Sequence, residues 1–212
     1  MVLVTYLITV ITAYLLGSIP TGYLVAKAKG VDIRAVGSGN IGATNVFRIL
    51  GKPAGILVLV VDGLKGFIAC AWAVDFIARH WGSATVDVEY LRIAAGLAVV
   101  LGHNYTCWLG FKGGKGIATS AGALAALVPW AFIIILFVFI IVFAISRIVS
   151  LSSIAAAASL PIATWLTKGT PTMILVTTLM ALLAIYKHKA NIQRLMNGTE
   201  SRIGKKKQEI SS

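Results

Sequence analysis

Charge is scarce in this sequence, and acidic charge is the scarcest. Its 212 residues are 12% charged and 58% hydrophobic, whereas about a quarter of a soluble domain is charged. This composition excludes intrinsic disorder and argues against a soluble globular domain. Cysteine and histidine are also rare, and the few present form no cluster with the spacing of metal ligands. We therefore expect no metal site and no other cofactor.

The first 26 residues contain no charge at all. They lack the basic region that begins a cleavable signal peptide, so we expect a retained first membrane span. The two cysteines, Cys70 and Cys107, lie in separate apolar stretches without a CxxC pair. We expect both to be buried thiols that carry no redox function.

Long apolar runs dominate the rest of the sequence. A helix that crosses a bilayer needs about 20 apolar residues, so the runs predict an all-α polytopic membrane protein with seven transmembrane helices. The fourth run has only about a dozen residues, which is short for a hydrocarbon core of roughly 30 Å. The whole chain, 1–212, is expected to form one domain, with a basic and flexible tail at about 201–212. The expected spans are Leu3–Ala26, Ala54–Ala78, Leu91–Leu109, Ile117–Val128, Trp130–Ser146, Leu151–Leu166 and Thr172–Tyr186.

The distribution of basic residues orients these spans. If the N-terminus is outside and the C-terminus is cytoplasmic, 15 of the 19 Lys and Arg residues fall on the inner face and three on the outer face. Lys65 is the one left within a span. This asymmetry follows the positive-inside rule. Because the net charge of +12 belongs to one membrane face, we expect contacts with membrane lipid and no nucleic-acid partner.

The first of two glycine-rich loops on the inner face covers 37–45 and is followed by Arg48. Its glycines match GxGxxG, and Asp62 follows at about the distance of a dinucleotide site. However, Asp62 lies within a run of membrane length, so no βαβ unit can form there. A dinucleotide site is therefore excluded.

The second loop covers 110–119 and leads into the short fourth span. It does not match GxxxxGK[ST], because Lys115 stands where that motif needs its second glycine. The physical features of an anion site are still present: glycines that let backbone N–H groups converge, a helix N-terminus and nearby cations. Tight turns between helices are the simpler explanation of either loop alone. Two such loops on one face, each with a threonine and a cation, favour phosphate binding.

Several polar residues stand where a span would not normally carry them. Asp62 and Lys65 are three residues apart and can face one another on a helix, as an ion pair or as substrate contacts. His103 and Asn104 lie toward the inner end of the third span. His188 and Asn191 follow the seventh span and share a helical face. Two His–Asn sets beside a cationic face favour a functional role.

Serines and one carboxylate complete the candidates on the inner face. Ser150, Ser152 and Ser153 begin the sixth span, where serine commonly caps a helix but can also donate to phosphate. We choose Ser153 among them. Glu200 lies in the basic C-terminal segment, and we expect it to order that segment through ion pairs.

These motifs, in this order and spacing, resemble the PlsY family of bacterial membrane acyltransferases. The resemblance covers nearly the whole chain. It rests on the segments 17–23, 37–48, 62–66, 102–104, 111–119 and 188–200. It implies transfer of a fatty acyl group from acyl phosphate to the 1-position of sn-glycerol 3-phosphate. The products would be lysophosphatidic acid and inorganic phosphate, in the first acylation of phospholipid synthesis. It also implies the bacterial cytoplasmic (inner) membrane and an active site on the cytoplasmic side.

The resemblance also assigns roles to residues of this chain. The catalytic set is Ser38, Arg48, Lys115, His188 and Asn191. The expected substrate and phosphate contacts are Gly39, Asn40, Thr44, Asn45, His103, Lys112, Gly113, Gly114, Gly116, Thr119 and Ser153. The expected structural residues are Asp62, Lys65 and Glu200.

The absence of a Ser-His-Asp or Cys-His set favours direct transfer without an acyl-enzyme. The base is either His188 or a phosphate oxygen of a substrate. An upstream enzyme that forms acyl phosphate is a possible partner. A transporter or channel for phosphate esters is the alternative function, but it would place polar groups near the bilayer midplane. Here they gather at one face.

Overall fold

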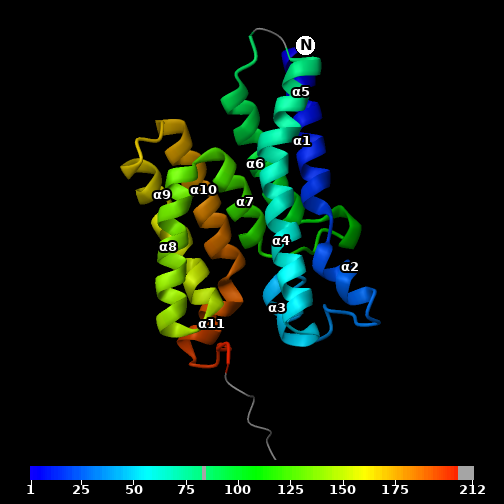
Figure 1. Ribbon diagram of the computed structural model, residues 1–212, viewed down its shortest axis with the longest axis vertical. Helices are drawn as coiled ribbons and strands as arrows, with labels where there is room; N and C mark the ends of the chain where they lie inside the picture. Colours follow the sequence, from blue (N-terminus) through cyan, green and yellow to red (C-terminus); the bar gives the residue numbers. More distant parts are fainter. Residues whose placement is uncertain (83–84, 205–212) are drawn as a thin grey trace, which may run out of the picture.

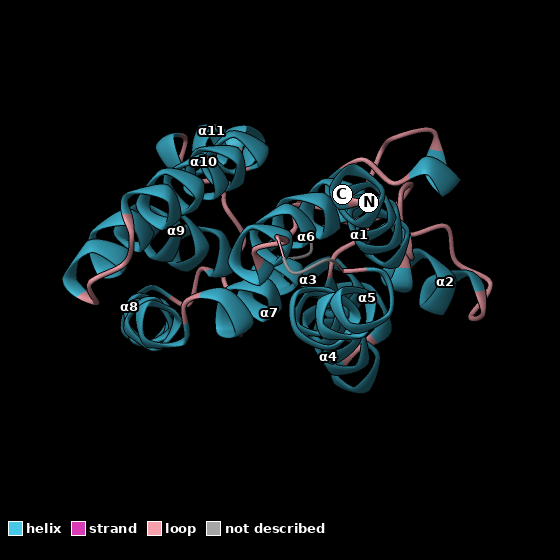
Figure 2. Ribbon diagram, turned by 90° about the horizontal axis from the view of Figure 1, so that it is seen from above, coloured by secondary structure: helices cyan, strands magenta, loops and turns pink. Residues whose placement is uncertain are grey.

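The computed structural model describes residues 1–82 and 85–204, and within these ranges the chain is helical and contains no strand. The helices run alternately up and down in two groups that stand side by side (Figure 1). One group contains α1 (Val2–Ser18), α4 (Lys52–Ile68) and α6 (Val88–Asn104). The other contains α8 (Pro129–Ser146), α9 (Val149–Leu166) and α10 (Pro171–Lys187). Viewed from above, the short α7 (Ile117–Leu127) lies between the groups (Figure 2).

Each predicted span contains a helix, and two of the helices are compound. After α1 the chain turns at Ile19–Pro20 and continues as α2 (Thr21–Lys27). After α4 it passes through a π-helical turn, Ala69–Ala73, into α5 (Val74–Trp81). The third predicted span is too long, because α6 ends at Asn104 and only a short 3₁₀ turn follows at Cys107–Leu109. There the hydroxyl of Thr106 donates to the carbonyl of Ser18, which ties this turn to the end of α1.

In the part of the chain that the structure describes, four helical segments are long and apolar enough to cross a membrane: Val2–Lys27, Lys52–Trp81, Pro129–Ser146 and Val149–Leu166. A fifth is obtained if α10 and α11 (Lys189–Met196) count as one span, bent by 58° between them. At 1.5 Å per residue, the 11 residues of α7 extend only about 16 Å. This length is about half of the hydrocarbon core.

Glycines bring the helices of the first group, and α7, into close contact. A Cβ atom at Gly66 of α4 would overlap the carbonyl of Thr119, and one at Gly122 of α7 would overlap the carbonyl of Gly63. The α1–α6 crossing uses Gly17 and Gly102 in the same way. Small residues are common where membrane helices pack closely, because lipid supplies no hydrophobic drive to join them. Gly66 and Gly122 therefore allow the close approach of α4 and α7.

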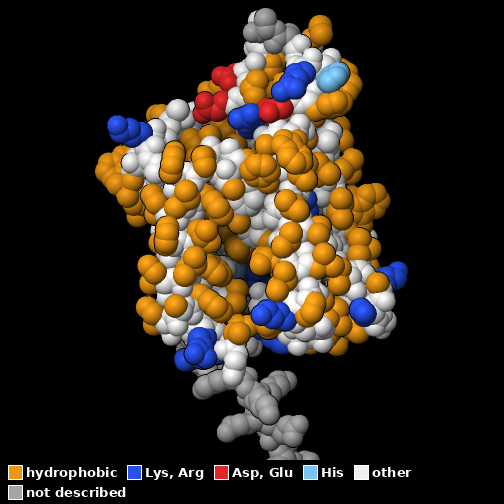
Figure 3. All heavy atoms as spheres, viewed as in Figure 1, with side chains coloured by type: hydrophobic (Ala, Val, Ile, Leu, Met, Phe, Trp, Pro, Cys, Tyr) orange, Lys and Arg blue, Asp and Glu red, His pale blue; other side chains and the backbone are white. Residues whose placement is uncertain are grey.

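Two short helices that the hydropathy pattern did not predict lie at one end of the bundle: α3 (Ala43–Leu50) and α11. Ile33, Ile41 and Val46 are buried there in a small core with residues of α2 and α4, which anchors the first glycine-rich loop. The space-filling view shows basic side chains at both ends and all the visible acidic ones at the opposite end from α3 and α11, with apolar surface between (Figure 3).

Candidate active site

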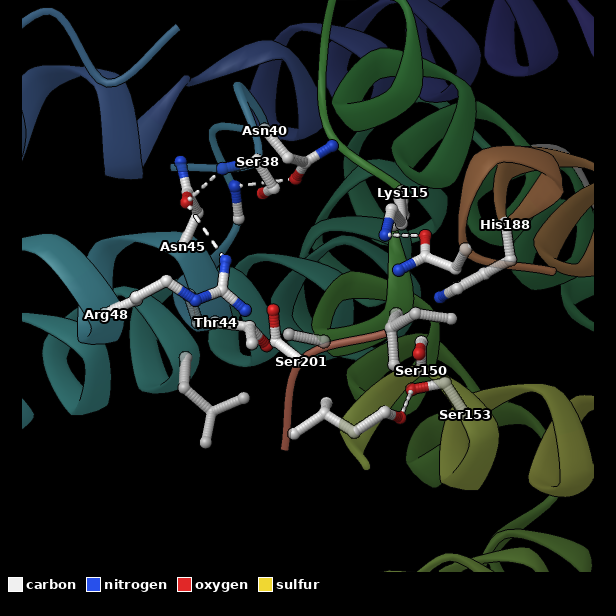
Figure 4. Close-up of a pocket in the computed structure, with 18 of the residues that line it drawn as sticks. Ser38, Asn40, Thr44, Asn45, Arg48, Lys115, Ser150, Ser153, His188 and Ser201 are labelled. Atoms are coloured by element: carbon white, nitrogen blue, oxygen red, sulfur yellow. Dashed lines mark hydrogen bonds between the residues drawn. The ribbon is translucent and has the colours of Figure 1, made fainter. Parts of the chain in front are cut away.

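A cavity of about 340 Å³ opens at the α3 and α11 end of the bundle. Its walls come from both groups of helices. Arg48, Ser38 and Thr44 lie on one side, and Lys115, His188, Ser150 and Ser153 lie on the other (Figure 4). Residues separated by more than 100 positions in sequence therefore face one space. The charged residues that border it are the cations Arg48, Lys115 and Arg194 and the carboxylates Asp62 and Glu200.

The first glycine-rich loop is held in shape by the side chain of Asn45. Its Oδ1 accepts a hydrogen bond from the backbone N–H of Ser38 at 2.9 Å, and its Nδ2 donates to the carbonyls of Ile33 and Val36. Gly37 and Gly39 have φ of +62° and +69°, a region that favours glycine. We expected Asn45 to contact substrate; it borders the cavity, and these bonds also make it the residue that shapes the loop.

Arg48 borders the cavity from α3. Its Nη1 lies 3.4 Å from Asn45 Oδ1. Among the described residues, no Asp or Glu forms an ion pair with its guanidinium. A guanidinium presents a planar fork of donors that matches phosphate oxygens. Arg48 is therefore a cation available to an anionic ligand.

The second glycine-rich loop is built differently. Gly113 N–H donates to the carbonyl of Asn104 and Gly114 N–H donates to that of His103, both in the last turn of α6. These amides are thus occupied, and neither glycine borders the cavity. A Cβ at Gly114 would overlap His103 Nε2, so the glycine makes room for the imidazole ring. Gly116 does border the cavity, where α7 begins.

Lys115 connects this loop to α11 by donating a hydrogen bond to Asn191 Oδ1. Burial lowers the pKa of Lys115 to about 8; Glu200 opposes the shift, whereas Arg194 and Arg48 add to it. The cation is therefore close to its titration range at neutral pH. An anion bound beside Lys115 would raise its pKa and so favour its charged form.

The segment after α11 folds back over the cavity. Glu200 accepts hydrogen bonds from Ser150, Asn191 and Arg194 at 2.7–2.9 Å. Burial alone would raise the Glu200 pKa, but these three bonds together hold it below its ordinary value. Ser201 and Ile203 border the cavity, and the Ile203 N–H donates to the carbonyl of Arg147. Of the predicted flexible tail, residues 205–212 lie outside the described part of the chain.

His188 stands at the bend between α10 and α11, buried, with its ring directed into the cavity (Figure 4). Its Nδ1 lies 2.8 Å from the carbonyl oxygen of Ala184. A carbonyl can only accept, so Nδ1 carries a proton. Nε2 of the neutral ring then holds a lone pair. This arrangement suits a hydrogen-bond acceptor or a general base.

Most of the predicted site residues border the cavity. Those that do are Ser38, Asn40, Thr44, Asn45, Arg48, Asp62, His103, Lys115, Gly116, Ser153, His188, Asn191 and Glu200. The predicted site residues that do not border the cavity are Gly39, Lys65, Lys112, Gly113, Gly114 and Thr119. Of these, Lys112 is exposed to solvent and Thr119 is fully buried.

Three further residues of the site were not assigned from the sequence. Arg194 falls three residues after Asn191 and six after His188, so this helical stripe could have revealed it. Ser150 was considered beside Ser153, and it is Ser150 that binds Glu200, whereas the Ser153 hydroxyl donates to Val149 within its own helix. No local pattern indicates Ser201.

Comparisons with known proteins agree with this geometry. The family model described as glycerol-3-phosphate acyltransferase matches residues 7–198. The chain belongs to the glycerol-3-phosphate acyltransferase family. A relative of that name from Geobacter sulfurreducens is 47% identical over 92% of this chain and 96% of its own length. Another glycerol-3-phosphate acyltransferase, from Clostridioides difficile, is 47% identical over 96% of this chain and 98% of its own length.

Two solved structures are also similar. The crystal structure of PlsY, an integral membrane glycerol 3-phosphate acyltransferase, in its glycerol 3-phosphate form is 43% identical. It has a TM-score of 0.84 and covers 94% of this chain and 96% of its own. The lysophosphatidic acid form has a TM-score of 0.81 and is 42% identical. The match covers 94% of this chain and 95% of that structure's chain. The resemblance to the PlsY family that the motifs suggested is thereby confirmed, and the chain is an acyltransferase of the membrane.

Proposed function

We propose that the chain transfers a fatty acyl group from acyl phosphate to the 1-hydroxyl of sn-glycerol 3-phosphate, releasing inorganic phosphate and lysophosphatidic acid. The single observation that carries this proposal is the cavity between Arg48 and Lys115, two cations without an ion-pair partner among the described residues. Each substrate carries a phosphate of about −1.5 to −2 charges near neutral pH. The family membership supports the glycerol phosphate as acceptor.

An apolar route for the acyl chain adjoins the charged groups. Leu59 of α4, Phe139 of α8 and Val149 of α9 border the same cavity. The space-filling view shows a hollow between the apolar side chains over α8 and α4, with basic atoms deep within it (Figure 3). Because α7 is short, it leaves a gap there between the two groups of helices. We expect the acyl chain to enter sideways from the lipid through this gap.

The chemistry needs positioning more than covalent help. Phosphate is a good leaving group, so the hydroxyl of glycerol 3-phosphate can attack the acyl carbonyl directly. Arg48 and Lys115 stabilise the negative charge that develops. His188 Nε2 is the protein group placed to accept the hydroxyl proton, and a substrate phosphate oxygen is the competing base. Retention of most of kcat/KM in His188→Ala would assign the base to the phosphate.

The membrane arrangement proposed is seven crossings with the N-terminus outside. The α3 and α11 end would then face the cytoplasm of a bacterial inner membrane. Two observations support it: α1 starts at the end opposite the cavity, and the acidic side chains visible in Figure 3 all lie at that opposite end, which leaves the cavity end basic. The helices α6 and α10, 17 residues each, extend about 25 Å. An upstream enzyme that forms acyl phosphate would deliver its product to this face.

A transporter of phosphate esters is disfavoured by the placement of the polar groups. Within the described residues, the catalytic candidates lie at one end of the bundle, whereas a transporter site lies near the midplane. The glycerol 3-phosphate and lysophosphatidic acid forms of the similar structures also correspond to a substrate and a product of acylation.

The test is a donor comparison with purified protein in lipid. Glycerol 3-phosphate is supplied with palmitoyl phosphate, palmitoyl-CoA or palmitoyl acyl-carrier protein, and lysophosphatidic acid and released phosphate are measured. We expect product from palmitoyl phosphate alone. Product from a thioester would overturn the donor, and the absence of product from every donor in folded protein would overturn the reaction.

A further inference from the structure

Asp62, Lys65 and His103 form a buried chain of contacts beside the cavity. Lys65 Nζ lies 2.8 Å from Asp62 Oδ1 and 3.0 Å from His103 Nδ1. It also lies 2.9 Å from the carbonyl oxygen of Ile19. The hydroxyl of Thr21 donates to Asp62 Oδ1 at 2.9 Å. Asp62 and His103 border the cavity, whereas Lys65 lies behind them.

The proton positions follow from the chemistry of these groups. An ammonium group has three N–H donors and no acceptor, and Lys65 has three neighbours at 2.8–3.0 Å. The charged form of Lys65 is favoured because a neutral amine would leave the buried Asp62 carboxylate without a counter-ion. Lys65 must then donate to His103 Nδ1. His103 is therefore neutral, with its proton on Nε2.

His188 has the opposite arrangement in the same cavity. The carbonyl of Ala184 holds the proton of His188 on Nδ1, at 2.8 Å, which leaves Nε2 as an acceptor. At His103 the ammonium occupies Nδ1, which leaves Nε2–H as a donor. The second glycine-rich loop lies beside the His103 ring, since Gly114 N–H donates to the His103 carbonyl, and the lack of a Cβ at Gly114 leaves space at Nε2.

We propose that Lys65 and Asp62 are positioning residues that hold His103 as a neutral, fixed hydrogen-bond donor toward the phosphorylated substrates, opposite His188 as the acceptor. The identity of the substrates rests on the proposed function. A neutral donor stabilises an oxyanion without repelling Lys115, and a donor held in place needs no reorganisation during the reaction. The buried ion pair thereby acts on the site through one imidazole.

The first experiment reads the tautomers directly. Protein labelled with ¹⁵N-histidine is studied in detergent by correlating each ring nitrogen with its attached and neighbouring protons. The variants His80→Gln and His188→Gln assign the three rings. We expect His103 to carry its proton on Nε2 and His188 on Nδ1. A proton on His103 Nδ1 would overturn the proposal whatever the enzyme's activity, so this result is separate from the donor comparison.

The second experiment removes the ion pair. Lys65→Met alone would strand Asp62 and endanger folding, so the double variant Asp62→Asn/Lys65→Met is used. We expect a folded protein in which His103 populates both tautomers, His188 is unchanged, and kcat/KM for glycerol 3-phosphate falls about tenfold, which is about 1.4 kcal/mol. The matched control, Asp75→Asn/Arg92→Met, breaks a more exposed ion pair of equal length at the opposite end and should keep full activity.

Two outcomes would contradict the positioning role. One is a folded double variant with unchanged kcat/KM, and the other is a lost rate with the His103 tautomer still single. If the double variant does not fold, Lys65→Arg decides: it keeps a charged donor beside His103, so the single tautomer and most of kcat should persist together. A Lys65→Arg variant that keeps the single tautomer and loses its activity would overturn the proposal.

Discussion

The two glycine-rich loops look alike in sequence and are built on different principles. In the first loop, Gly37 and Gly39 have positive φ, and the side chain of Asn45 supplies the internal hydrogen bonds. In the second, Gly113 and Gly114 use their own amides to bind the end of α6 and leave room for His103. Glycine therefore serves backbone conformation in one loop and close approach in the other. Only the structure distinguishes the two uses.

Asn45→Ala is the substitution expected to disrupt the first loop most. It removes three bonds to Ser38, Ile33 and Val36. At about 1 kcal/mol for each hydrogen bond, the loss is about 3 kcal/mol. If this free energy is lost from the binding of the transition state, kcat/KM drops by about 100-fold. Asn40→Ala, which removes a single bond to Gly42, is the matched comparison and should cost several-fold. Equal activity of both variants would show that Asn45 does not shape the loop.

Removal of the first loop's cation has the next largest effect. If Arg48 binds substrate phosphate, Arg48→Gln should lose a charge-assisted hydrogen bond worth about 1.5–3 kcal/mol, or about 10–100-fold in kcat/KM. Lys52→Gln, an exposed cation at the start of α4 that does not border the cavity, is the control. Steady-state kinetics with each substrate varied in turn measure both. Wild-type kinetics of Arg48→Gln would remove the residue from the site.

Gly114→Ala tests the second loop. The new Cβ would overlap the His103 ring, and overpacking of this kind costs about 1–3 kcal/mol. We expect a kcat/KM reduced by up to about 100-fold and a lower Tm. Gly110→Asn is the control, since the space around Gly110 is open and asparagine tolerates its φ of +60°. An unaffected Gly114→Ala would show that the ring moves freely.

The smallest effect is expected from pH, and it concerns Lys115. Burial lowers its pKa to about 8, so the cation is present below that pH and is lost as pH rises through it. From pH 7 to pH 9 the charged fraction falls about tenfold, and kcat/KM of the free enzyme should fall with it. Lys115→Arg keeps its charge throughout and should abolish this decline. A decline that persists in Lys115→Arg would belong to another group.

Which residues meet in the cavity could be predicted well, because hydropathy places each loop at one end of a helix. Arg48, Lys115 and His188 follow from the loop positions and from the family resemblance, and all three border the cavity. The function of each backbone amide could not be predicted. Gly113 and Gly114 were expected to bind phosphate, but their N–H groups bind carbonyls of α6. Such bonds join segments that hydropathy treats as independent.

The sequence alone determined the helical membrane architecture, the basic face and the family, because apolar length, charge and motif spacing are local properties of the chain. The tertiary structure decided that Asn45 shapes a loop, that Lys65 contacts His103 and that Glu200 ties α9 to α11. It also decided which nitrogen of each histidine faces a donor or an acceptor. The longest of these contacts join Lys65 to His103 across 38 positions and Ser150 to Glu200 across 50, and only close packing brings such atoms within hydrogen-bond distance.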